Sequence, residues 1–190
     1  MFIGLDQSTT KTGVAVYDSA SNHRCIYYGL IRPDGEDWLA RISVTVSSLL
    51  KLIEQHPPVR VFIEEPFYFS KNSSSLHQLL ALEKIIKWEL YKLGIPFQTV
   101  PTKQNSGWPA TVGVSGTKEH FAKAIQPYCP TIFVAETHIL KNGTYTLKKK
   151  YQGKDYLTYD VSDAIGVLCG GLQITVDKLS VIKFNRLNMI

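Results

Sequence analysis

Cysteine is scarce in this chain, with three among 190 residues: Cys25, Cys129 and Cys169. Their number is odd and none stand in a Cys-x-x-Cys pair, which argues against a disulfide framework and against a structural zinc site. The chain also lacks an apolar run of about 20 residues, the length needed to span a bilayer, and it opens without the basic and apolar regions of a signal peptide. We therefore expect a soluble protein of a reducing compartment, the cytoplasm.

Repeats, low-complexity tracts and linkers are likewise missing. Hydrophobic residues make up 44% of the chain and aromatic residues 11%, which is enough to build a core in a chain of this length. The sequence predicts one domain over residues 1–190, with a hairpin-like insertion at about residues 131–158.

Acidic residues are few in the second half of the chain. Residues 1–100 hold ten basic and ten acidic residues, whereas residues 101–190 hold eleven basic and six acidic ones, so the net charge of +5 arises entirely there. Lys123, Lys148, Lys149 and Lys150 belong to this excess. If these lysines share a face, they provide a binding surface for phosphates; the alternative for residues 148–154 is a solvated hairpin without a ligand.

Hydrophobic periodicity predicts an α/β fold with a mixed central sheet flanked by helices. Gly94 and Pro96 end the strongest helix, and Asn142-Gly143 is a typical two-residue hairpin turn within the insertion. We expect strands at 2–5, 14–17, 25–31, 59–64 and 97–100, helices at 38–55, 76–93, 117–125 and 160–174, and hairpin strands near 132–135 and 156–159.

Two of the predicted strands end in an acidic residue. Asp6 follows an apolar strand, and Glu64 ends another. If these strands are neighbours, the two acids lie about 5 Å apart, which suits a bridging metal ion. Glu65 competes with Glu64, but side chains alternate along a strand, so only one of the two can face the same side as Asp6; we choose Glu64. Asp6 could instead be a turn residue or a helix cap.

Two further acids, Asp160 and Asp163, stand three residues apart at the start of the closing helix. This spacing puts both carboxylates on one helix face, where a cation would offset their repulsion. The alternative, two acids stabilised by the helix dipole, needs no metal. Together with Asp6 and Glu64, they form an oxygen-rich set that suits Mg²⁺ or Mn²⁺. Two such ions can activate a water and stabilise the leaving oxygen of a phosphodiester.

These acidic motifs resemble those of the RuvC-like Holliday junction resolvases. Residues 4–13 (GLDQSTTKTG) are similar to the first motif of that family, residues 63–65 (IEE) to the second, and residues 160–164 (DVSDA) to the closing one. The resemblance covers residues 1–130 and 156–174. It implies an RNase H-like fold and a Mg²⁺-dependent endonuclease that cuts Holliday junctions or other branched DNA, with two ions per active site.

The resemblance also implies roles for residues outside the carboxylate set. Phe67 stands where the family has a Phe that enters the opened junction, and Tyr68 and Lys71 follow it as further DNA-binding candidates. Lys103 and Lys118 are expected near the scissile phosphate, where either would stabilise developing charge. The family is dimeric, and the apolar helix 76–93 could supply a homodimer interface or could instead be a fully buried core helix.

The long Lys- and Tyr-rich segment 131–158 departs from the cellular members of the family and favours a bacteriophage-encoded one, active in the host cytoplasm. Three other functions stay open. The first motif also resembles the phosphate loop of ATP-binding sugar kinases and Hsp70-like proteins, which share the fold but need two such domains. The chain could also be a non-catalytic nucleic-acid-binding module, or a nuclease acting on RNA–DNA hybrids, RNA, flaps or forks.

Overall fold

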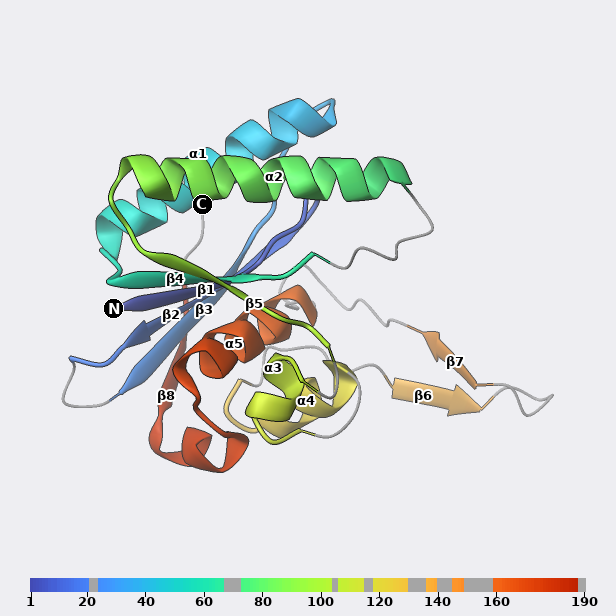
Figure 1. Cartoon of the computed structure of the whole chain (residues 1–190). Coiled ribbons are helices and arrows are strands. Elements are labelled where there is room, and N and C mark those ends of the chain that lie inside the picture. Colours follow the sequence, from blue (N-terminus) through green and yellow to red (C-terminus); the bar gives the residue numbers. More distant parts are fainter. Residues whose placement is uncertain are drawn as a thin grey trace.

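The central element is a six-stranded mixed sheet with the strand order β5-β4-β1-β2-β3-β8 (Figure 1). The computed structural model describes residues 1–20, 24–66, 73–103, 106–114, 118–129, 136–139, 145–148 and 159–187. The strands of the sheet are β1 (Phe2–Asp6), β2 (Thr12–Asp18), β3 (Cys25–Ile31), β4 (Arg60–Glu64), β5 (Phe97–Val100) and β8 (Lys183–Arg186). This architecture confirms the predicted mixed sheet flanked by helices.

Strand direction changes within the sheet. β2 pairs antiparallel with both β1 and β3, whereas β4 pairs parallel with β1 and with β5. β8 pairs parallel with β3 at the far edge. β1 and β4 are therefore interior neighbours that run in the same direction, so their carboxyl ends meet at one edge of the sheet.

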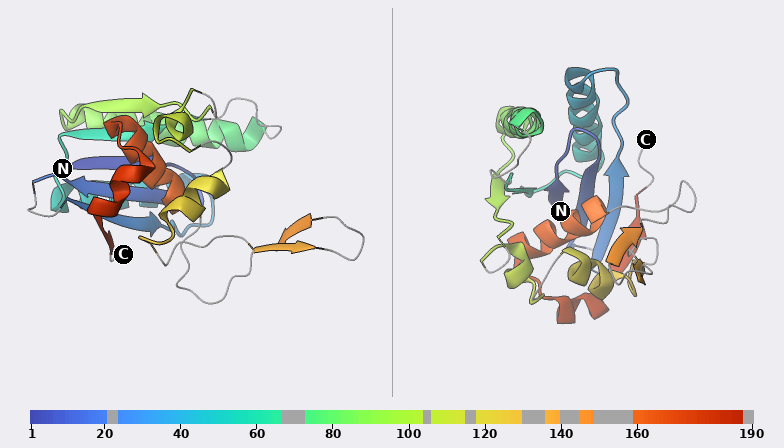
Figure 2. Two further views of the ribbon diagram at one scale, coloured as in Figure 1. Left: turned by 90° about the horizontal axis from the view of Figure 1, so that it is seen from below. Right: turned by 90° about the vertical axis from the view of Figure 1, so that its right-hand side faces the viewer.

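Helices cover both faces of the sheet, as the two views of Figure 2 show. α1 (Trp38–Gln55) and α2 (Ser73–Lys92) lie on one face. Their apolar side chains pack with alternate strand residues, Ile3 and Leu5 of β1 and Val61 and Ile63 of β4 among them. Because side chains alternate along a strand, the strand residues that lie between these positions face the opposite side of the sheet.

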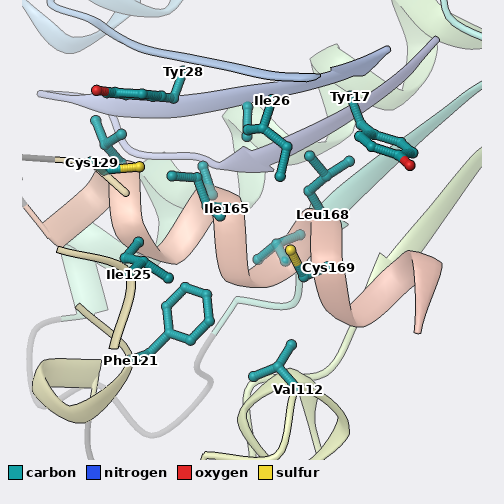
Figure 3. Close-up of a cluster of buried hydrophobic side chains, with 14 of the residues drawn as sticks. Tyr17, Ile26, Tyr28, Val112, Phe121, Ile125, Cys129, Ile165, Leu168 and Cys169 are labelled. Atoms are coloured by element: carbon teal, nitrogen blue, oxygen red, sulfur yellow. The ribbon is translucent and has the colours of Figure 1, made fainter. Parts of the chain in front are cut away.

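The second face is covered by α5 (Tyr159–Leu172), with α3 (Trp108–Thr111), α4 (Lys118–Ile125) and the short helix η1 (Val176–Val181) around it. Figure 3 shows α5 between the strands and α4, with Ile165 and Leu168 turned toward the core. The helix lies very close to the sheet. A Cβ atom at Gly4 would lie 2.5 Å from Leu168 Cβ, and one at Gly13 would overlap the main-chain carbonyl of Asp160.

The predicted helix boundaries are right to within a few residues. Asp37 caps α1, its Oδ1 accepting from the Ala40 N–H at 2.8 Å. α2 begins at Ser73 and ends at Lys92, where we predicted 76–93; serine is well suited to the first turn, where N–H groups lack intrahelical partners. α5 ends at Leu172 rather than 174 because Gln173 takes a left-handed conformation (φ 56°) and the Ile174 N–H bonds to the Cys169 carbonyl at 2.8 Å.

Three elements were not predicted: α3, η1 and β8. α3 has four residues and contains Pro109, and β8 is a charged edge strand, so neither carries a long apolar pattern. In the insertion, the hairpin is present but its strands differ from the prediction: β6 (Glu136–Ile139) pairs antiparallel with β7 (Tyr145–Lys148). Tyr159 begins α5 and is not a hairpin residue. The predicted strand 132–135, the turn 142–143 and residues 156–158 of the second predicted strand lie outside the described residues.

The two alternatives for α2 can now be separated. Leu82, Ile86 and Leu90 are fully buried against the sheet, but Trp88 and Tyr91 are 58% and 70% exposed. Their rings stack with centroids 5.8 Å apart. The alternative of a fully buried core helix is therefore wrong, because only one face of α2 meets the sheet.

We expect Gly13→Ala to destabilise the fold by about 1–3 kcal/mol, since the added methyl group has to push the start of α5 away from β2. Urea unfolding followed by circular dichroism measures this loss. As a control, Ser43→Ala on the exposed face of α1 should change the free energy of unfolding by less than about 0.5 kcal/mol. A Gly13→Ala variant as stable as the control would contradict the close approach of α5.

Candidate active site

Asp6 and Glu64 end the two central parallel strands side by side. β1 and β4 pair in register with Leu5 opposite Ile63, so the two acids occupy the next matched positions. Neighbouring strands are about 4.8 Å apart. Both side chains are buried, with 8% of Asp6 and 9% of Glu64 exposed.

Both acids face the α5 layer. Phe2 of β1 and Phe62 of β4 belong to the cluster that packs with α5, and Asp6 and Glu64 follow them at even spacing along their strands. Glu64 therefore faces the same layer as Asp6, while Glu65 follows the end of β4.

α5 brings the other two acids to the same end of the sheet. Asp163 is 2% exposed and Asp160 is partly buried, and both lie in the first turns of the helix. The Asp160 carbonyl packs against Gly13, which is the cross-strand partner of Asp6. The start of α5 therefore lies over the strand pair that carries Asp6.

Gln7 completes this end of the sheet, and the sequence did not single it out. Its side-chain N–H donates to the Glu64 carbonyl at 2.7 Å, which ties the ends of β1 and β4 together. Its Oε1 atom is buried and has no hydrogen-bond partner in the described part of the chain. The side chain lines a pocket of about 280 Å³ together with Asp6, Glu64, Glu65, Pro66, Leu79 and Thr102.

A second contact missed by the sequence involves Trp108. The indole N–H of this fully buried residue donates to Glu64 Oε1 at 3.2 Å. No pattern in the sequence could have indicated it, because Trp108 and Glu64 are 44 positions apart and α3 is too short to show a helical period.

The donor set suits a hard divalent cation. Its atoms are carboxylate oxygens and the amide oxygen of Gln7, and Mg²⁺ and Mn²⁺ prefer oxygen ligands. Within the described residues, no group of three or more Asp, Glu, His or Cys side chains is arranged to hold a metal ion. Since like-charged carboxylates repel each other, a cation would have to draw them together. The buried Gln7 Oε1 atom supports the fit, because a polar oxygen in such a place needs a partner.

The basic candidates are only partly described. Lys103 is exposed, in the loop after β5, and its carbonyl accepts the N–H groups of Ser106 and Gly107. Lys123 is exposed on α4, and Lys118 is the first residue of that helix. Lys148 is the last residue of β7. Phe67, Tyr68, Lys71, Lys149 and Lys150 lie outside the described residues.

Thiol chemistry is not available at this site. Cys25, Cys129 and Cys169 are all buried, and none is bonded to another cysteine. Burial raises the pKa of Cys169 to about 12. Burial and then the neighbouring Cys169 raise the pKa of Cys129. Figure 3 shows both sulfur atoms within the apolar cluster around α5.

A sheet of this topology, with acids at the ends of adjacent central strands and on a closing helix, defines the RNase H-like class of folds. The family model "Crossover junction endodeoxyribonuclease RuvC" matches residues 2–105. This match extends over more than half of the chain, and the chain belongs to the RuvC family. It is therefore a crossover junction endodeoxyribonuclease, a structure-selective nuclease that resolves junctions. Nucleases of this family generally depend on divalent metal ions.

Solved structures of resolvases share the fold. RuvC of Thermus thermophilus in complex with a Holliday junction substrate has a TM-score of 0.62 and 13% identity, covering 90% of this chain and 92% of that one. The same protein in another structure has a TM-score of 0.57 and 13% identity, with coverage of 95% and 96%. The yeast mitochondrial Holliday junction resolvase Ydc2 has a TM-score of 0.56 and 12% identity, with coverage of 90% and 77%.

No curated protein sequence matches the chain. The family match nevertheless separates the open alternatives, since it favours a junction-resolving nuclease over a sugar kinase or an Hsp70-like protein. Across the segments that the structure describes, no helix is long and apolar enough to cross a membrane.

We expect Cys129 and Cys169 to resist modification by a thiol reagent such as DTNB at pH 8. Their raised pKa values keep both thiols protonated there, and burial blocks access. The absorbance of the released thiolate measures the reaction, and both cysteines should react once urea unfolds the chain. Rapid labelling of either residue in the folded protein would contradict the burial of these two thiols.

Proposed function

We propose that this chain resolves Holliday junctions by hydrolysing phosphodiesters at a site formed by Asp6, Glu64, Asp160 and Asp163. The in-register pairing of β1 with β4 carries this proposal, because it sets Asp6 and Glu64 level at one end of the sheet, where the start of α5 packs against Gly13. The junction-bound T. thermophilus RuvC has the same fold and supports the choice of substrate.

In this proposal, the four carboxylates hold two Mg²⁺ ions, and Mn²⁺ can replace them. When bound, such ions activate a water and stabilise the leaving oxygen of the scissile phosphodiester. The pocket wall at Gln7 and Thr102 bounds the space next to Asp6 and Glu64. Lys103 and Lys118 stabilise the negative charge that develops on the phosphate oxygens.

We further propose that DNA is bound by residues outside the carboxylate set. Phe67 stacks on an unpaired base at the junction centre, with Tyr68 and Lys71 beside it in sequence. Lys123, Lys148, Lys149 and Lys150 contact phosphates, and the salt dependence of binding should reflect them. Residues 1–190 act as one nuclease domain, with the insertion at 131–158 presenting part of this basic surface. We also propose that the chain acts in the cytoplasm, that of a host cell if it is phage-encoded, which is consistent with an enzyme that cuts DNA.

A homodimer follows from the symmetry of the substrate. A four-way junction presents two equivalent strands, and a two-fold dimer can cut both. The exposed side of α2, where Trp88 and Tyr91 stack, offers an apolar surface for a second copy.

The substitutions Asp6→Asn, Glu64→Gln, Asp160→Asn and Asp163→Asn should each lower cleavage by at least ~100-fold, because each removes a charge that holds the metal ions. Labelled four-way, forked and linear DNA, incubated with Mg²⁺ or with EDTA, measures this loss. Junction binding, measured by gel shift in Ca²⁺, should survive.

The matched control is Glu54→Gln, an exposed carboxylate at the end of α1, which should cut like wild type. Wild-type rates for Asp6→Asn, Glu64→Gln or Asp160→Asn would remove that residue from the site. Hydrolysis of ATP without cleavage of any DNA would instead support the kinase-like alternative.

Phe67→Ala should slow junction cleavage under single-turnover conditions by about 10-fold, which corresponds to losing one base–aromatic stack of ~1–3 kcal/mol. Binding of Mn²⁺ should stay unchanged, since Phe67 carries no metal ligand. Phe97→Ala, at a partly exposed phenylalanine of β5, serves as the control. An unchanged cleavage rate would assign Phe67 to a structural role.

A further inference from the structure

Trp108 is the largest fully buried side chain in the described part of the chain, and it contacts Glu64. It is 1% exposed and begins α3, just after the loop that carries Lys103. Its main-chain N–H donates to the Pro101 carbonyl at 2.8 Å, which folds this loop back on itself. The residue therefore has a fixed position at the point where β5 leaves the sheet.

One edge of the indole ring meets the active site. The Nε1–H group donates to Glu64 Oε1 at 3.2 Å, and both groups are buried. A hydrogen bond to a charged acceptor is stronger than one between neutral groups, and it restricts the direction of the carboxylate. A carboxylate also has about four lone-pair sites, so accepting one N–H leaves capacity to bind a cation.

The remainder of the ring packs against α5, the helix that carries Asp160 and Asp163. A Cβ atom at Gly166 would overlap the six-membered part of the indole, and one at Gly170 would lie 2.5 Å from Trp108 Cβ. Phe121 of α4 meets the ring edge-on, with centroids 5.2 Å apart and an interplanar angle of 73°. Because Gly166 and Gly170 carry no side chains, the indole ring of Trp108 packs directly against the backbone of α5.

These contacts connect parts of the site that come from different elements. Through its N–H, Trp108 holds the Glu64 carboxylate of β4, and through its ring it rests on the helix that bears the other acids. A rotation of the Glu64 side chain away from α5 would break its hydrogen bond with the Trp108 N–H. A movement of α5 would disturb the packing of the indole ring against Gly166 and Gly170.

We propose that Trp108 is a positioning residue that sets the Glu64 carboxylate relative to the acids of α5, and that its N–H group is the essential part. This inference rests on the metal-dependent function proposed above. Groups that hydrogen-bond to metal-ligating side chains typically contribute ~10–100-fold to metal affinity or activity. Trp108 should therefore act through the affinity of the site for its metal, without touching the DNA.

The test replaces Trp108 with 3-benzothienylalanine, which retains the two fused rings but carries sulfur in place of the N–H group. We expect the Mg²⁺ concentration that gives half-maximal junction cleavage to rise by ~10–100-fold, with most of the rate recovered at saturating Mg²⁺. Binding of Mn²⁺ to the protein without DNA, followed by electron paramagnetic resonance of the free ion, should weaken to the same degree. Trp108→Phe should give at least as large a shift.

Trp38→Phe is the control, because Trp38 packs on the opposite face of the sheet, beside the α1–α2 cluster. It should leave both metal measurements unchanged. If Trp108→Phe fails to fold, the benzothienyl variant decides alone, since it preserves the ring packing. Wild-type Mg²⁺ dependence and Mn²⁺ affinity in that variant would overturn the inference. A wild-type chain that neither binds Mn²⁺ nor cuts junctions would overturn the proposed function, and the positioning role with it.

Discussion

The parallel pairing of β1 with β4 is the constraint on which the site depends. Asp6 and Glu64 are 58 positions apart in the chain, and only the register that sets Leu5 opposite Ile63 brings them level. Parallel neighbours need a crossover connection, and β2, β3 and α1 form it here. Residues 7–63 can therefore be understood as the connection that returns a second acid to the end of β1.

The site also requires that α5 packs closely against β1 and β2. Gly4 and Gly13 carry no side chains, so the backbone of α5 lies almost directly on β1 and β2 at these two positions. A bulkier pair of residues would lift the helix and carry Asp160 and Asp163 away from Asp6. The glycines in the first motif thus act on the geometry of the site, although they contribute no chemical group to it.

The site combines strong charge with deep burial, and this combination explains its supporting contacts. Asp6, Glu64 and Asp163 are at least nine-tenths buried, and buried carboxylates are costly unless they are paired or bound to a cation. Gln7 and Trp108 supply neutral hydrogen-bonding groups that fix the strand ends and one carboxylate without cancelling the charge. A lysine or arginine in either place would compete with a metal ion for the same oxygens.

The sequence by itself determined the order of the longer strands and helices and the acids that end β1 and β4, because these follow from local periodicity and alternation. It also carried the motifs by which the RuvC family could be named. Only the tertiary structure decided that β1 and β4 are adjacent and that Gln7 and Trp108 reach Glu64. It also decided that α2 buries one face and leaves Trp88 and Tyr91 exposed. These are contacts between residues far apart in the chain, and they depend on how layers pack, which no local pattern encodes.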